Sequence, residues 1–158
     1  MRRPQYPLEP LADVRERQVD DAVRGLATAV SQREAAARRT VALEQAAASH
    51  ADAVEGVKQA ERDALGRGEL TAADLAHAHA WELRMQAERA ALVAEQERAR
   101  AAETAAGVAE DRSREELAWR RGDADVVAKD RARWEAGQRK RADAKEEEAM
   151  AEAFRLKR

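Results

Sequence analysis

Three histidines and three serines are the side chains of this sequence best suited to metal binding or nucleophilic catalysis. His77 and His79 lie two residues apart, so on a helix they project about 200° apart and cannot share a metal ion. If the chain folds back on itself at Gly68, so that residue i faces residue 136 − i, His50 faces residue 86 and lies away from His77 and His79. No serine lies in a G-x-S-x-G turn, and the glycines form no phosphate-binding loop. The sequence therefore predicts a protein that is not an enzyme, with no metal site and no cofactor.

The composition indicates long helices rather than a compact core. The chain has 158 residues, of which 40 are alanine and only 11 each are leucine and valine, and 38% are charged. Alanine buries little area, so a globular core of this length would need more large side chains. Such an Ala-, Glu- and Arg-rich composition is typical of long helices and coiled coils. The 29 basic and 31 acidic residues are interleaved and nearly balanced, which argues against nucleic acid as a partner.

Targeting and compartment signals are absent from the printed sequence. No apolar run approaches the roughly 20 residues that a membrane-spanning helix needs, and the N-terminus has no apolar core of a signal peptide. Cysteine is absent, which is compatible with a reducing compartment. The expectation is a cytoplasmic protein without an integral membrane segment.

Helix-breaking residues divide the chain at one place. All three prolines lie in the first ten residues, and the next strong break is the segment Leu65–Thr71, which contains two glycines. Glycine supplies the left-handed conformation that ends a helix, while Thr71 and Asp74 have capping-box-like spacing. We predict helix one over 8–65, a turn over 66–70 and helix two over 71–156, together forming a single hairpin domain, 1–158.

The large apolar residues of the two predicted helices are arranged as mirror images. If the chain folds back at Gly68, residue i faces residue 136 − i. Val19 then faces Leu117 and Trp119, and the regions 31–40 and 94–107 both lack large apolar residues. This predicts an all-α fold, a long antiparallel two-helix coiled-coil hairpin. Large apolar residues recur at intervals of 11, as in the series Leu8, Val19, Val30, Val41, a period that favours a straight or weakly right-handed pair.

The predicted helices differ in length. The mirror partner of helix one ends near residue 128, which leaves 129–158 as a C-terminal single-helix overhang. Four large apolar residues in it have no partner within the chain under this scheme: Trp134, Met150, Phe154 and Leu156. An unsupported helix that carries large apolar side chains is expected to contact another protein.

The beginning of the chain resembles a known family. The segment from Tyr6 to Glu16, YPLEPLADVRE, is similar to the aromatic-x-Leu-x-x-Leu-x-x-(Leu/Val)-Arg start of the stalk proteins of type III export, called FliJ in flagella and YscO in injectisomes. The size, the central glycine-containing turn and the charged tail ending in AEAFRLKR are also similar. The resemblance covers the chain by architecture, although its motifs are short.

The resemblance implies a mechanical and regulatory function without catalysis. Members of this family are two-helix rods that dock in a hexameric export ATPase, promote its assembly and activity, and contact the export gate protein and the export chaperones. It implies a place at the cytoplasmic face of the inner membrane, reached through these partners. The residues expected to bind partners lie at the open end and in the tail: Tyr6, Leu8, Leu11, Val14, Val126, Val127, Trp134 and Phe154.

Other interpretations of the same sequence stay open. A structural coiled-coil tether would have no effect on an ATPase, and a client-binding helical-hairpin adaptor would hold an unfolded protein between its arms. A single charged helix without a hairpin would be about 230 Å long at 1.5 Å per residue.

Overall fold

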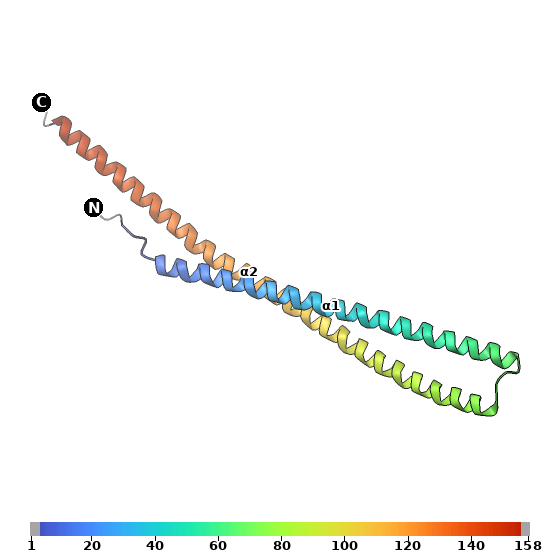
Figure 1. Ribbon diagram of the computed structural model, residues 1–158. Coiled ribbons are helices and arrows are strands. Elements are labelled where there is room, and N and C mark those ends of the chain that lie inside the picture. The colour runs from blue at the N-terminus through green and yellow to red at the C-terminus, as the bar shows by residue number, and fades with distance from the viewer. Residues whose placement is uncertain (1–3, 156–158) are drawn as a thin grey trace. The chain divides into compact units, whose positions relative to one another are not determined.

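The computed structural model describes residues 4–155, except for the side chains of residues 153 and 154. Helix α1 spans Glu9–Gly66 and helix α2 spans Ala72–Arg155, and together they include nearly all of the described residues (Figure 1). The predicted all-helical fold is therefore confirmed. The predicted bounds, 8–65 and 71–156, are displaced by one residue at both ends of α1 and at the start of α2, and residue 156 lies outside the described part.

The end of α1 is closed by backbone hydrogen bonds around a left-handed glycine. Gly68 has a φ of 71°. The amide of Glu69 donates to the carbonyl of Ala64 at 3.0 Å, and the amide of Gly68 donates to the carbonyl of Leu65 at 3.0 Å. These two bonds form a Schellman motif, which satisfies carbonyls that the helix end leaves without partners. The predicted glycine stop is confirmed, with Gly68 as the left-handed residue.

The start of α2 is held by the capping box that the sequence predicts. The Thr71 hydroxyl donates to Asp74 Oδ2 at 2.6 Å, and the Thr71 amide donates to the same oxygen at 2.8 Å. The Asp74 amide donates in turn to Thr71 Oγ1 at 3.3 Å. The hydrogen bonds from Thr71 lower the pKa of Asp74 below its ordinary value. Aspartate therefore serves here in place of the usual Glu or Gln.

Two glycines at this turn allow a matched stability test. Gly68→Ala forces a Cβ into a positive-φ conformation, and we expect it to lower the free energy of unfolding by about 1 kcal/mol. Gly66→Ala, two residues earlier and inside α1, replaces glycine by the best helix former where a Cβ meets nothing within 4 Å. It should raise the free energy of unfolding by up to about 1 kcal/mol. Thermal unfolding followed by circular dichroism measures both, and equal effects of the two variants would contradict this description of the turn.

Contacts divide the chain into two units. Unit 1 comprises Met1–Ala27 and Arg112–Arg158, and unit 2 comprises Thr28–Asp111. Within unit 1, Glu9 pairs with Arg131 at 3.1 Å and Arg15 pairs with Asp123 at 2.9 Å. The residue number on α2 thus falls as the number on α1 rises.

Unit 2 has the same reversed order of contacts. Arg33 pairs with Glu110 at 3.3 Å, and Lys58 pairs with Glu82. Between these pairs, Glu44 lies 2.8 Å from Arg100. In each unit, taken by itself, residues of α1 contact residues of α2 in descending order, as a helical hairpin requires.

The register differs from the mirror scheme by two to eight residues, and most at Arg33 and Glu44, which pair with Glu110 and Arg100 rather than with residues 103 and 92. The scheme places residue 121 opposite Arg15 and residue 86 opposite His50, whereas the contacts are with Asp123 and Glu88. At Lys58 the difference is larger, because its partner is Glu82 rather than residue 78. The position of the turn accounts for a shift of two to four residues. Helix α1 continues to Gly66 and α2 begins at Ala72, so the midpoint of the connection lies nearer to residue 69 or 70 than to Gly68.

The buried stripes of both helices follow spacings of three and four residues, not eleven, apart from one step of seven on α1 between Ala29 and Ala36. Glu110, Leu117 and Val127 of α2 are 2%, 7% and 8% exposed. The buried and half-buried stripe of α1 comprises Ala12, Arg15, Val19, Ala22, Leu26, Ala29, Ala36, Thr40, Leu43, Ala47, His50 and Val54. That of α2 comprises Leu92, Gln96, Ala99, Glu103, Ala106, Glu110, Ser113, Leu117, Arg120, Ala124, Val127, Arg131 and Trp134. We call these two stripes the seam.

The 11-residue series is therefore wrong as a description of the seam. Leu8 and Val41, two of its members, are 44% and 51% exposed, while Thr40 beside Val41 is buried. A seam with alternating spacings of three and four repeats every seven residues. Eleven residues do not fit that repeat, so successive members of the series rotate away from the seam and only some of them are covered. Trp119, which was expected to lie opposite Val19, is 66% exposed. Leu117, two residues earlier, occupies the seam position instead.

Candidate partner-binding sites

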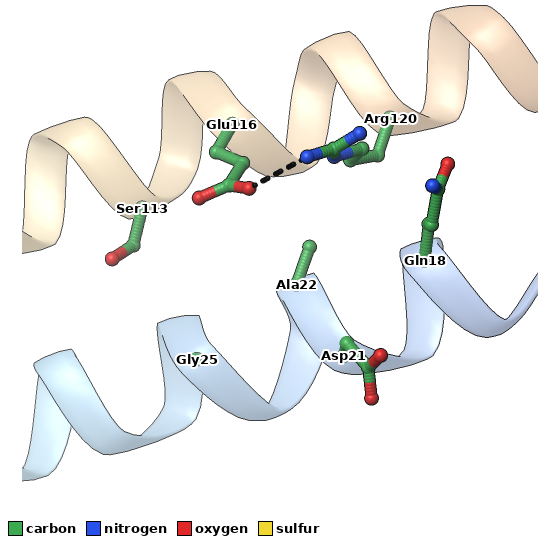
Figure 2. Close-up of a pocket in the computed structure, with 7 residues that line it drawn as sticks. All are labelled: Gln18, Asp21, Ala22, Gly25, Ser113, Glu116 and Arg120. Atoms are coloured by element: carbon green, nitrogen blue, oxygen red, sulfur yellow. Dashed lines mark hydrogen bonds and ion pairs between the residues drawn. The ribbon is translucent and has the colours of Figure 1, made fainter. Parts of the chain in front are cut away.

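The structure holds shallow grooves rather than an enclosed active site within its described residues. The groove drawn in Figure 2 lies in unit 1 between α1 and α2 and has a volume of about 210 Å³. Its lining comprises Gln18, Asp21, Ala22, Gly25, Ser113, Glu116 and Arg120. Arg120 donates to Glu116 at 3.3 Å, so the arginine that lines the groove already pairs with a carboxylate of the same helix. Three other grooves have volumes of about 370–470 Å³, within the roughly 300–1,000 Å³ range of small-molecule pockets, but they are open at the surface rather than enclosed.

Metal chemistry has no visible site in the described part of the chain. Among residues 4–155, no group of three or more His, Asp or Glu side chains is placed to hold a metal ion. His50 Nε2 lies 3.4 Å from Glu88 Oε2 but makes no hydrogen bond within the described residues. The most specific side-chain geometry among the described residues lies near the N-terminus.

An aromatic contact joins the residues before α1 to α2 in unit 1. Tyr6 is 6% exposed, and its hydroxyl donates to Asp130 Oδ2 at 2.6 Å. Its ring meets the ring of Trp134 edge to face, with the centroids 5.7 Å apart and the planes at 60°. Glu9, the first residue of α1, pairs with Arg131 at 3.1 Å. We call the contacts of Tyr6 and Glu9 with Asp130, Arg131 and Trp134 the aromatic clasp.

The clasp corrects the expectation that Trp134 has no partner in the chain. The predicted overhang began at 129, but Asp130, Arg131 and Trp134 all contact residues 6–9. The cause lies in the residues before α1. Proline disfavours continuation of a helix toward the N-terminus, so residues 4–6 are not helical, and Tyr6 lies against α2. Beyond the clasp, every residue from 139 to 152 is exposed.

The clasp makes the stability of unit 1 sensitive to alkaline pH. The hydrogen bond to Asp130, with a contribution from burial, raises the pKa of Tyr6 from 10.0 to about 12. Its neutral form is thus favoured in the folded state. The stabilisation is fully present below pH 10 and is lost as the pH rises through 12. Because the chain has a single tyrosine, its titration by ultraviolet absorbance reports on this residue alone.

The Tyr6→Phe variant controls the alkaline titration. It keeps the ring on Trp134 and removes only the hydroxyl that donates to Asp130. We expect a smaller loss of thermal stability between pH 10 and 12 in this variant than in the unchanged chain. A tyrosine that titrates at its ordinary pKa of 10.0 would contradict the buried hydrogen bond.

The predicted partner-binding residues fall into two groups. Leu8, Leu11 and Val14 are 44%, 39% and 44% exposed, and Val126 is 68% exposed. Tyr6 and Val127 are buried, and Trp134 is half-buried, so these three are covered by the chain itself. The side chain of Phe154 lies outside the described residues. The role of all eight in binding partners stays a prediction.

Polar residues in the seam were missed by the sequence interpretation. Arg15 and His50 occupy seam positions on α1, and Glu110 and Gln96 occupy them on α2. Gln96 donates to the backbone carbonyl of Leu43 at 3.2 Å, and Glu110 is 2% exposed beside Arg33. Polar groups at such positions fix the register of a coiled coil at a cost in stability. The mirror scheme places Arg121 opposite Arg15, two like charges, so it gave no signal for the observed pair of Arg15 with Asp123.

Comparisons with models of protein families, with characterised proteins and with solved structures found no match to this chain. Within the described residues, neither helix contains a stretch long and apolar enough to cross a membrane.

Proposed function

We propose that this chain is a non-enzymatic stalk of a type III export ATPase complex, in the manner of the FliJ/YscO family. In this proposal α1 and α2 form one antiparallel coiled-coil hairpin, and α2 beyond the aromatic clasp is a single-helix overhang. The observation that carries the proposal is the pair of helices, 58 and 84 residues long, joined by one short turn. Their reversed contacts in each unit support a hairpin, and its unequal arms suit a protein that connects two larger assemblies.

Exposed apolar residues near the start of α1 support the proposed contact with the hexameric ATPase. Leu8, Leu11 and Val14 are each more than a third exposed, although they lie beside the seam. Exposed apolar side chains that lie close together, as these three do at intervals of three residues, are typical of a surface that binds another protein. We assign the open end of the hairpin to the ATPase, where it promotes assembly and activity. The export gate protein and the export chaperones complete the proposed set of partners, and they would hold the chain at the cytoplasmic face of the inner membrane.

The charged end of α2 is assigned to partners rather than to the fold. Residues 139–152 are all exposed, and they include the run Glu146–Glu148 and the cluster Arg139–Arg141. Met150 among them is 60% exposed. Removing this segment takes away no described buried side chain, so the fold should tolerate its loss.

Truncation tests the proposal. A variant that ends at residue 138 keeps the clasp, whereas one that ends at 128 removes Asp130, Arg131 and Trp134 as well. We expect both to bind the export ATPase of the same organism at least about tenfold more weakly in co-sedimentation. Only the shorter variant should also unfold at a lower temperature. Full binding by the variant that ends at 138 would mean that residues 139–158 do not contribute to the proposed contact with the ATPase. Absence of binding by the full chain would overturn the stalk proposal.

A client-binding adaptor is the second candidate, because exposed apolar residues continue into unit 2. Leu75, Leu83 and Val93 of α2 are 41%, 54% and 43% exposed. An adaptor would suppress aggregation of an unfolded protein when no ATPase is present. A structural tether would neither suppress aggregation nor affect the ATPase. Light scattering of an aggregating client therefore separates the adaptor from the tether and the stalk, and the rate of ATP hydrolysis separates the tether from the stalk.

A further inference from the structure

A second stripe of residues with spacings of four and three runs along α2 in unit 1. It comprises Glu115, Trp119, Gly122, Val126, Lys129 and Arg133, and all six are exposed. Each lies two positions after a seam residue, as Trp119 does after Leu117. Two positions correspond to about 200° around a helix, so this stripe lies on the face of α2 opposite the seam. We call it the outer stripe.

The centre of the outer stripe is apolar and has a glycine in it. Trp119 and Val126 are 66% and 68% exposed, more than any other large apolar side chain among the residues that the structure describes. Gly122 lies between them, and a Cβ at this position would meet nothing within 4 Å. Glycine weakens a helix, and the packing of this chain gives no reason for it here. A glycine flanked by exposed apolar residues allows another backbone to come close.

The charged residues of the outer stripe have no partner within the described chain. Glu115, Lys129 and Arg133 make no ion pair or hydrogen bond with any residue from 4 to 155. The acidic residue stands at one end of the stripe and the basic residues stand at the other. A stripe with this arrangement is complementary to a copy of itself that runs in the opposite direction.

We propose that a second copy of this chain packs against the outer stripe, with the two α2 helices antiparallel. The two-fold axis passes near position 124, so that Val126 of each copy packs on Gly122 of the other. Residues at equal distances from that axis then meet: Glu115 pairs with Arg133, and Lys129 lies beside Trp119, whose ring also holds the guanidinium of Arg120 of its own chain at 5.5 Å. Such an interface is isologous and forms each contact twice. A parallel arrangement would place like charges together.

The proposed dimer is independent of the stalk function, and its test needs no ATPase. We expect the full chain to shift from monomer to dimer between about 1 and 100 μM in sedimentation velocity, as suits an interface at the small end of the stable range. Gly122→Gln places a bulky helix former at the axis and should weaken dimerisation at least about tenfold. It should leave the thermal unfolding temperature of the monomer unchanged or raised, because glutamine favours the helix. Gly56→Gln, at an exposed glycine of α1 with equal free space, is the matched control and should not affect dimerisation.

A charge exchange tests the antiparallel register. Glu115→Arg should weaken the dimer, because the new arginine of each copy meets Arg133 of the other copy and the like charges repel at both symmetry-related positions. The double variant Glu115→Arg with Arg133→Glu should restore it. A chain that stays monomeric over the whole concentration range would overturn the proposal, as would a dimer that none of these variants weakens. A dimer weakened by Gly122→Gln without rescue by the charge exchange would overturn the antiparallel register.

Discussion

Replacement of Leu117 by alanine should lower the free energy of unfolding by about 2–3 kcal/mol, the largest single-residue effect on stability that we expect. Leu117 is 7% exposed and is the only leucine among the buried residues that the structure describes. Its neighbours along the seam, Ser113, Arg120 and Ala124, are small or polar and bury little apolar area. The loss of one large side chain therefore removes much of what holds α1 and α2 together in unit 1.

Leu83→Ala is the matched control for Leu117→Ala. The substitution is the same, but Leu83 is 54% exposed, and exposed positions usually change stability by no more than about 0.5 kcal/mol. Urea unfolding followed by circular dichroism measures both free energies. Equal effects would contradict the seam as we describe it, because they would mean that Leu117 is no better covered than Leu83.

The double variant Leu11→Ser with Val14→Ser should bind the export ATPase about a hundredfold more weakly than the unchanged chain. Both side chains are exposed in the free protein, so binding rather than folding would account for their apolar character. A few apolar anchors commonly supply most of the binding energy of an interface, at 1–2 kcal/mol or more each. The measurement is an affinity by surface immobilisation or calorimetry, with circular dichroism to verify unchanged helix content.

Val41→Ser with Val57→Ser is the control for the double variant at the open end. These valines are 51% and 47% exposed, but they lie in unit 2, outside the proposed ATPase contact. The two substitutions should leave the affinity for the export ATPase unchanged. Equal losses in the two double variants would indicate that apolar residues along all of α1 contribute, as expected for an adaptor rather than a stalk.

The helices and their ends could be predicted because the signals are local. Gly68 ends α1 through its own backbone conformation, and Thr71 with Asp74 starts α2 through hydrogen bonds three residues apart. Neither depends on what packs against the helix. The prolines before α1 act in the same way, because proline restricts its own backbone and that of the preceding residue.

The seam could not be predicted because its members are mostly alanine and polar residues. Ala29 and Ala99 are buried, whereas many other alanines of the same helices are exposed, and nothing in an alanine itself distinguishes the two. The interpretation therefore relied on large apolar residues, and Trp119 and Val126 show why this was misleading: they lie on the opposite face. The clasp was missed for a related reason. The predicted helix one begins at residue 8 and the predicted overhang at 129, so Tyr6 and Asp130 were both left out of the mirror scheme, although it places them opposite each other.

The rate of ATP hydrolysis by the export ATPase of the same organism, measured with and without this protein, tests the central claim most directly. Light scattering of the same samples follows assembly of the ATPase. The stalk account predicts faster hydrolysis together with hexamer formation, and loss of both with the Leu11→Ser, Val14→Ser variant. An unchanged rate and an unchanged assembly state, at concentrations far above a micromolar affinity, would contradict it.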